Sequence, residues 1–267
     1  MQSPADDDGF NYVLCEYCNG GTLVDYLLKH ECKLNQLQIV DCMLQIVDGL
    51  DHIHSKGISH RDLKVENILV THGGGGRPVL KLGDFGSATK QHSINYETAT
   101  KMEIYRFLEV IEGECTHMYR APEMLDRWQG HNVDGAQTDV WMLGCVLYVL
   151  CTGNKHPFQD AQNLTILNAQ YSMSESGNNL ANLHPISPLK DVIRALLVPD
   201  PNKRLTLAQL RQILLKLQRG EEVTIKLCEE AAEIKKKQLL AIQRADPAKY
   251  DQMMDAMVTQ SFISEEK

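Results

Sequence analysis

The stretch ISHRDLKVENILV, residues 58–70, decides the fold because it sets a dense polar cluster directly against an apolar run. Charged groups on a loop usually form only a solvated face. Here a predicted strand segment lies on each side of the cluster, so the cluster is not part of a continuous solvent-exposed face. We therefore predict a rigidly held loop whose polar side chains are used, namely His60, Arg61, Asp62, Lys64, Glu66 and Asn67.

Composition limits the class of protein. The 267 residues are 43% hydrophobic, enough for a large buried core, and the net charge of -8 argues against general affinity for nucleic acid or anionic membranes. The start, MQSPADDDGFNY, lacks the apolar core of a secretion signal, and the longest apolar run, residues 140–151, is too short to cross a bilayer. We expect a globular protein of the cytoplasm or nucleus, without a transmembrane segment, in which residues 140–151 form a central buried helix.

Two further patterns favour structural interpretations. The eight cysteines mostly lie in apolar stretches, as reduced thiols of a core do, and the pair Cys15 and Cys18 has no second pair at zinc-ligand spacing. The glycine run in THGGGGR, residues 71–77, lacks the Lys-Ser/Thr of a phosphate-binding loop. It is interpreted as a hairpin tip.

Hydrophobic periodicity predicts the main elements. The clearest is a helix over residues 35–55, capped by Asn35 with Gln38 three positions later. The other predicted elements are a buried strand over 11–18, a short helix over 22–30, strands over 67–70 and 78–82, an irregular loop over 86–118, and helices with short breaks over 119–217.

Two motifs follow the opening stretch, LGDFGSAT at 82–89 and MYRAPEML at 118–125. The three together, in this order, resemble the signature of protein kinases: catalytic loop, Asp-Phe-Gly and Ala-Pro-Glu. A lysine two places after Asp62 is the serine/threonine pattern. The resemblance implies a Ser/Thr kinase that uses ATP and Mg²⁺ to phosphorylate protein substrates.

The chemistry of phosphoryl transfer explains these residue types. The reaction depends on positioning and on neutralising phosphate charge more than on covalent participation by the protein. By resemblance, Asp62 orients the substrate hydroxyl, and Lys64 lies near the transferred phosphate. Thr116 would contact the side chains of Asp62 and Lys64 and shape the pocket for the residue after the phosphorylated one. Asn67 and Asp84 would supply oxygen ligands for magnesium.

The resemblance also implies structural roles. Asp139 would anchor the backbone of the catalytic loop, and Glu123 would form a buried ion pair with Arg204. His60 and Phe85 are expected to pack the loops. Arg61 would pair with a phosphate on the loop beyond Gly86, for which Ser93, Thr98 and Thr100 are candidates.

Further stretches narrow the resemblance. HRDLKVEN, DFGSAT, GGTLVDYL, LYVLCTGNKHPF and PDPNKR are together most similar to the Numb-associated (Ark/Prk-type) kinases, which include the cyclin-G-associated and adaptor-associated kinases. The similarity covers roughly residues 10 to 217. It implies phosphorylation of endocytic adaptor subunits in the cytoplasm.

Alignment by this resemblance also implies a nucleotide site. Its adenine contacts would be the gatekeeper Cys15, the Glu16 carbonyl, the Cys18 backbone and Leu69, and its ribose contacts would be Thr22 and the Glu66 carbonyl.

The family's small N-terminal lobe supplies a glycine-rich loop, a strand lysine and its glutamate partner, and none is found upstream of Phe10. We therefore expect a mainly α (α+β) fold, a kinase-like C-terminal lobe with short β-hairpins, the N-terminal lobe absent and little activity from the chain alone. The expected division is 1–9 acidic loop remnant, 10–21 hinge strand and linker, 22–217 C-terminal lobe and 218–267 helical tail.

The tail falls outside the resemblance. Residues 221–245 have helical spacing, and Asp246-Pro247 can begin a second helix, which suggests a pair that binds a protein partner. The alternative to an enzyme is a non-catalytic, pseudokinase-like module that binds partners.

Overall fold

A computed structural model describes residues 13–72, 77–90, 93–125, 132–173, 188–223 and 225. All of these except residue 225 belong to one compact unit, residues 1–223. Its helices are α1 (Leu23–Lys29), α2 (Gln36–His54), α3 (Lys101–Glu114), α4 (Pro122–Leu125), α5 (Gly135–Thr152), α6 (Asn163–Leu167), α7 (Leu189–Leu196) and α8 (Leu207–Gln218). Its strands are β1 (Ile68–His72), β2 (Pro78–Leu82), β3 (Ser93–Ile94) and β4 (Val133–Asp134).

The helix predicted over 35–55 is confirmed as α2, and its start has the expected chemistry. The Asn35 side chain accepts a hydrogen bond from the Gln38 backbone, and the Gln38 side chain accepts one from the Asn35 backbone at 2.9 Å. This reciprocal box satisfies two N–H groups that a helix start leaves without partners. The apolar face of α2 is buried.

The central apolar helix is also confirmed, as α5. Its side chains are buried on every side from Thr138 to Thr152. It packs against α2 and α7. At Gly144, α5 and α7 approach so closely that an added Cβ would lie 2.9 Å from the Cβ of Leu196 on α7.

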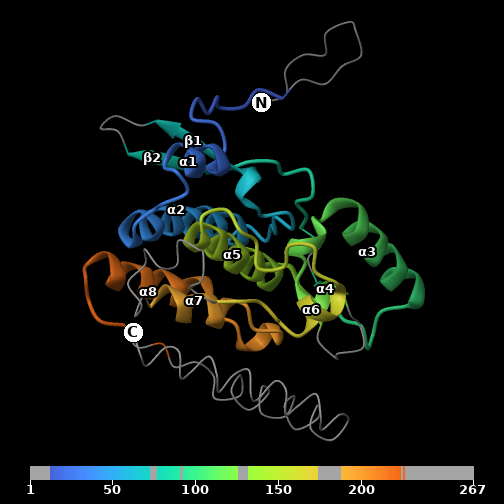
Figure 1. Cartoon of the computed structure of the whole chain (residues 1–267). Helices are drawn as coiled ribbons and strands as arrows, with labels where there is room; N and C mark the ends of the chain where they lie inside the picture. Colours follow the sequence, from blue (N-terminus) through green and yellow to red (C-terminus); the bar gives the residue numbers. More distant parts are fainter. Residues whose placement is uncertain are drawn as a thin grey trace, which may run out of the picture. The chain divides into compact units, whose positions relative to one another are not determined.

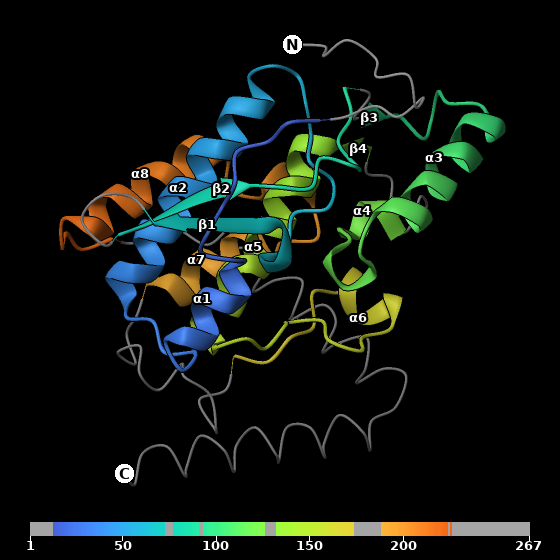
Figure 2. The same cartoon turned by 90° about the horizontal axis from the view of Figure 1, so that it is seen from above.

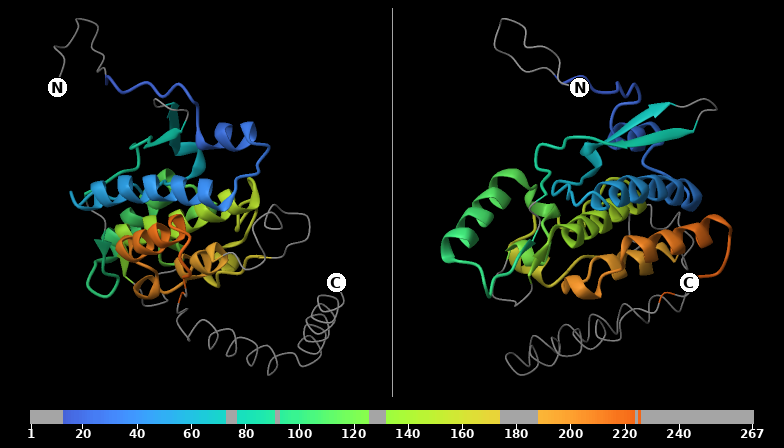
Figure 3. Two further views of the ribbon diagram at one scale, coloured as in Figure 1. Left: turned by 90° about the vertical axis from the view of Figure 1, so that its left-hand side faces the viewer. Right: turned by 180° about the vertical axis from the view of Figure 1, so that it is seen from behind.

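The layers are visible in Figure 1 and from two other sides in Figure 3. Helix α2 lies between the β1–β2 hairpin and α5, α7 packs on α5, and α8 packs on α2. Seen from above in Figure 2, α3 stands at the edge opposite α8. The core therefore supports the catalytic-loop stretch, which runs between α2 and β1.

Two small antiparallel sheets complete the described part. Strands β1 and β2 pair from Ile68↔Leu82 to His72↔Pro78, which confirms the strands predicted over 67–70 and 78–82. The glycine run 73–76 between them lies outside the described residues. The second sheet pairs β3 with β4 and ties the segment after Gly86 to the start of α5.

The strand predicted over 11–18 is wrong where the structure describes it. Residues 13–18 form no regular element, and Val13, Leu14 and Tyr17 are exposed. A strand is stable only when a neighbour completes its hydrogen-bond ladder. No backbone partner for 13–18 is found among the described residues.

The irregular loop predicted over 86–118 is also wrong in part, because it contains the 14-residue helix α3. The local signal was available in the sequence. Thr100 and Glu103 form a capping box, and Ile104 and Ile111, seven residues apart, are buried. The helices predicted after residue 119 are confirmed in the described ranges as α4 to α8.

The predicted tail helices, within residues 218–267, lie outside the described residues. Helix α8 ends at Gln218, and beyond it the structure describes only residues up to 223 and residue 225. Among the helices that the structure describes, none combines the length and apolar character needed to cross a bilayer.

Candidate active site

The catalytic loop is anchored on a carboxylate buried in α5. The backbone N–H groups of His60 and Arg61 each donate to Asp139 at 2.8 Å, and Nε2 of His54 lies 2.7 Å from the same carboxylate. Arg61 has a φ of 65°, in the left-handed region that costs energy for a residue with a Cβ. The bonds to Asp139, which is fully buried, hold this conformation as the resemblance implied.

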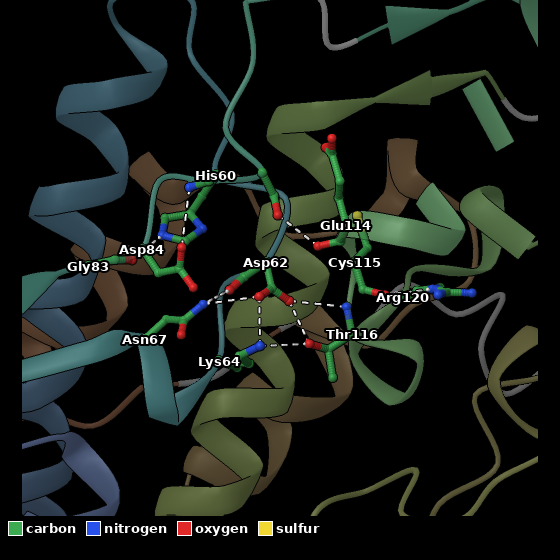
Figure 4. Close-up of polar contacts among 12 residues, drawn as sticks. His60, Asp62, Lys64, Asn67, Gly83, Asp84, Glu114, Cys115, Thr116 and Arg120 are labelled. Carbon is green, nitrogen blue, oxygen red and sulfur yellow. Dashed lines mark hydrogen bonds and ion pairs between the residues drawn. The ribbon is translucent and has the colours of Figure 1, made fainter. Parts of the chain in front are cut away.

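Four predicted catalytic residues meet around one carboxylate, as Figure 4 shows. Oδ1 of Asp62 accepts from the hydroxyl of Thr116 at 2.6 Å and from its backbone N–H at 3.1 Å. Oδ2 accepts from Nζ of Lys64 at 2.7 Å and from Nδ2 of Asn67 at 3.1 Å. Nζ of Lys64 also donates to the Thr116 hydroxyl at 2.8 Å, which closes the ring of contacts.

These contacts set the protonation state of Asp62. Burial is the largest influence and disfavours the carboxylate, but hydrogen bonds from Lys64 and Thr116 together with the charge of Lys64 outweigh it, so the pKa of Asp62 is lowered from its usual value of 3.8. A carboxylate offers about four acceptor positions. Four donors already occupy Asp62, so a fifth must displace one of them.

The two predicted magnesium ligands are neighbours at the edge of this cluster. The N–H of Gly83, which precedes Asp84, donates to the Asn67 carbonyl at 2.8 Å, and Figure 4 shows both side chains on the same side of Asp62. The Asn67 amide donates twice to Asp62, so its Oδ1 is left without a hydrogen bond in the described ranges. The Asp84 side chain is exposed.

This donor set fits magnesium. No group of three His, Cys, Asp or Glu side chains in the described part of the chain converges as a metal site. Magnesium needs no such cage, because it is usually held by one or two protein oxygens together with water and substrate phosphates. A carboxylate at Asp84 and an amide oxygen at Asn67 meet that requirement.

Arg61 has a partner that the sequence analysis missed. Its Nη2 lies 2.6 Å from Oε2 of Glu114, the last residue of α3, and its Nε donates to the Ser87 carbonyl at 2.7 Å. The Ser87 hydroxyl in turn donates to the Glu114 carbonyl at 2.7 Å. In this structure the partner of Arg61 is thus a carboxylate, and its pairing with a phosphate stays a prediction.

The predicted ion pair between Glu123 and Arg204 is present. Nη1 and Nη2 donate to the two carboxylate oxygens at 2.7 and 2.6 Å, and both side chains are fully buried. Arg204 also donates to three backbone carbonyls and stacks over Trp141 at 5.1 Å from the ring centroid. The pair joins α4 to the turn before α8.

Part of the predicted nucleotide site also comes together. Thr22 bridges to Leu69 on β1, and the neighbouring Gly20 donates its N–H to the Val70 carbonyl at 2.8 Å. Gly20 is needed here, because an added Cβ would lie 2.6 Å from that carbonyl oxygen. The Leu69 side chain lies 3.0 Å from the Cβ position of Gly83, so it connects this edge to Asp84.

The remaining predicted nucleotide contacts are not gathered. Cys15 is exposed and Cys18 is half-buried, both outside any regular element. The Glu16 side chain instead pairs with Lys81 on β2 at 3.1 Å. Glu66, whose carbonyl is the predicted ribose contact, is exposed and lines a pocket together with Thr116.

That pocket, of about 410 Å³, opens beside the catalytic cluster. It is lined by Glu66, Thr116 and Tyr119, and by His156 and Asp160 from the turn after α5. His156 packs on the Tyr119 ring at 4.3 Å between centroids, and burial lowers its pKa to about 3, so it is neutral near pH 7. The sequence analysis used LYVLCTGNKHPF, residues 147–158, for the family resemblance alone and assigned His156 no role.

Comparison with known proteins decides the family. Residues 2–215 match the family described as the protein kinase domain. The chain belongs to the protein kinase family. The match spans the catalytic cluster, its anchor and the buried ion pair.

The relatives of this kinase chain include serine/threonine kinases. It is 33% identical over 198 residues to a probable serine/threonine-protein kinase of Dictyostelium discoideum, covering 72% of this chain and 16% of that protein. It is 30% identical over 215 residues to the actin-regulating kinase PRK1 of Saccharomyces cerevisiae, covering 78% and 24%. It is 32% identical over 204 residues to the actin-regulating kinase 1 of the same yeast, covering 74% and 29%. The chain therefore spans less than a third of the length of these three relatives.

The family match corrects the expected fold class. The expectation of a C-terminal lobe alone, with the N-terminal lobe absent, is wrong, because the kinase domain match covers residues 2–215. It thus includes residues 2–9 of the predicted acidic loop remnant and the whole predicted hinge strand and linker, 10–21. That expectation depended on motifs not found upstream of Phe10, and the position at which a sequence begins carries no physical information about a fold. The internal boundaries at 9, 21 and 217 remain predictions.

Proposed function

We propose that this kinase chain transfers the γ-phosphate of ATP to serine or threonine hydroxyls of protein substrates, with Asp62 as the residue that orients the hydroxyl. The observation that carries the proposal is the convergence of Lys64, Asn67 and Thr116 on the Asp62 carboxylate. Its lowered pKa keeps Asp62 ionised near pH 7, as an acceptor for a hydroxyl proton must be.

The full occupancy of Asp62 suggests an order of events. A substrate hydroxyl can bind only if one donor leaves, and Lys64 is the donor that a phosphate group attracts most strongly, because its ammonium carries the charge. Movement of Lys64 toward the nucleotide would free one position on Oδ2, while Thr116 and Asn67 keep the carboxylate oriented.

The nucleotide would lie along the edge formed by Thr22, Leu69 and Asp84. Asn67 and Asp84 would hold magnesium, which neutralises phosphate charge when it is bound. Cys15, Glu16, Cys18 and the Glu66 carbonyl remain proposed adenine and ribose contacts by resemblance.

The substrate class is proposed from the resemblance to the Numb-associated kinases. Two of the relatives are named actin-regulating kinases, in agreement with the Numb-associated group, and we propose an endocytic adaptor subunit of the cytoplasm as the substrate class. The pocket of about 410 Å³ beside Thr116 would receive the residues next to the phosphorylated one.

The test measures transfer of labelled phosphate from Mg-ATP to a threonine peptide. Replacing a group that assists proton transfer costs about 10²- to 10⁴-fold, so Asp62→Asn should lower kcat by that factor. The matched control is Asp48→Asn, an exposed carboxylate on α2 that pairs with Arg211. Equal rates in the wild-type and Asp62→Asn proteins would favour the alternative, a non-catalytic module that binds partners.

A further inference from the structure

The segment between Asp84 and Glu123, here called the activation segment, is held by hydrogen bonds from residues of the chain itself. Strand β3 pairs with β4, the Tyr96 hydroxyl donates to the Glu123 carbonyl at 3.1 Å, and α3 begins with its own capping box. The described part of the segment thus has hydrogen bonds at its start, middle and end.

The end of α3 is fixed by arginines on two sides. Arg120 donates to the carbonyls of Glu112 at 3.1 Å and Cys115 at 3.0 Å, which satisfies acceptors that a helix end leaves free. Arg61 reaches the same end from the catalytic loop and pairs with Glu114. Two positions after Glu114, Thr116 donates hydrogen bonds to Asp62. The position of the end of α3 therefore affects the position of the candidate catalytic carboxylate.

We propose that Glu114 is a built-in anion for Arg61, so that the catalytic loop of this chain is assembled without phosphorylation of the activation segment. Three observations support this role. The Arg61 side chain is 10% exposed, and its charge would be poorly solvated without a partner. Glu114 supplies a full negative charge at 2.6 Å, the property that a phosphate would bring. The Ser87 carbonyl takes the Nε donor, so Arg61 already has an acceptor on each side.

Two of the three predicted phosphate positions, Thr100 and Ser93, make other contacts. The Thr100 hydroxyl caps α3, where it donates to Glu103 at 2.7 Å and accepts from the Glu103 backbone. Ser93 pairs with Asp134 in the second sheet, and Thr98 is exposed. None of the three has a hydrogen bond or ion pair with Arg61 in the structure.

The first test uses hydrogen–deuterium exchange and does not depend on catalysis. The Thr89 N–H donates to Ser59 across the bridge between the activation segment and the catalytic loop, close to the Ser87 carbonyl that Arg61 holds. Glu114→Gln should raise exchange of a peptide over 86–90 about tenfold, the change expected when one charge-assisted hydrogen bond is weakened. Glu112→Gln, the same change at an exposed position of α3, should leave it unaltered. Equal exchange in the two variants would overturn the proposal, and Glu114→Asp should be intermediate.

The second test measures phosphate transfer and rests on the proposed function. Wild-type protein treated with phosphatase, and shown by mass to carry no phosphate, should keep its kcat within threefold, and a larger loss would overturn the proposal. Glu114→Gln should lower kcat about tenfold with little change in the KM of the peptide, because it misplaces Thr116 and Asp62. If the wild-type protein transfers no phosphate in either state, the proposed function fails while the exchange comparison still decides the role of Glu114.

Discussion

The catalytic loop and the segment 13–18 belong to the same compact unit but differ in how their polar groups are satisfied. Around Asp62 every acceptor position of a buried carboxylate is filled by donors from the chain itself. In 13–18 the one side-chain hydrogen bond or ion pair with another described residue is the exposed pair of Glu16 with Lys81, at 3.1 Å. Buried polar groups must be paired, whereas exposed ones exchange freely with water. The first region is therefore ordered by its own contacts, and the second has little in the described chain to order it.

The largest effect should come from breaking the buried pair below the catalytic loop. In Glu123→Gln the Arg204 charge loses its partner while it stays fully buried, which typically costs about 3–5 kcal/mol of the free energy of unfolding. Urea denaturation of the whole chain measures this. Glu109→Gln on α3 is the control, because Glu109 is exposed and should change the same quantity by less than about 0.5 kcal/mol.

A loss below about 1 kcal/mol in Glu123→Gln would contradict the distinction between the two regions. It would mean that Arg204 finds enough stabilisation from Trp141 and from the carbonyls of Gln137, Val198 and Pro199 without the carboxylate.

The same difference explains what the sequence could predict. Helix α2, the β1–β2 hairpin and the Asp62 cluster were predictable because their signals are local or their partners are fixed by motifs of known spacing. Helix α3 carries a local signal too, the Thr100 and Glu103 box, but its polar composition hid it. The pairing of Arg61 with Glu114 joins residues 53 positions apart and lies in no motif used here.

The segment 13–18 shows the opposite limit. Its apolar residues, Val13, Leu14 and Tyr17, read as a buried strand, yet burial depends on a surface elsewhere that receives them. The residue pattern of a segment predicts which of its faces is apolar, but it does not predict which other part of the molecule covers that face. The proposed adenine contacts Cys15, Glu16 and Cys18 lie in this stretch, so resemblance alone supports them.

An intermediate effect is expected from the pH dependence of the Asp62 cluster. Because the pKa of Asp62 is lower in the folded chain than in the unfolded one, its contribution to stability is present above the unfolded value, near 4, and is lost as pH falls through the folded value. At pH 6 the free energy of unfolding of the wild-type protein should be about 1–2 kcal/mol larger than that of Asp62→Asn. The difference should shrink toward pH 3.

Urea denaturation of both proteins at pH 6, 5, 4 and 3 gives the comparison. A constant difference over this range would show that the hydrogen bonds of Asp62 do not favour its ionised form. Lys64→Met should reduce the pH dependence, because it removes the charge and one of the donors that lower the pKa.

The smallest effect should be at the exposed pair of Glu16 and Lys81. Their side chains are 60% and 42% exposed, and water and salt screen such pairs to less than about 0.5 kcal/mol. A double-mutant cycle with Glu16→Gln and Lys81→Gln, measured by urea denaturation in low salt and in 1 M NaCl, isolates the pairwise energy. A coupling above about 1.5 kcal/mol that persists in high salt would show that segment 13–18 is held firmly against β2. The contrast with the catalytic loop would then fail, and the proposed adenine contacts would gain a fixed position.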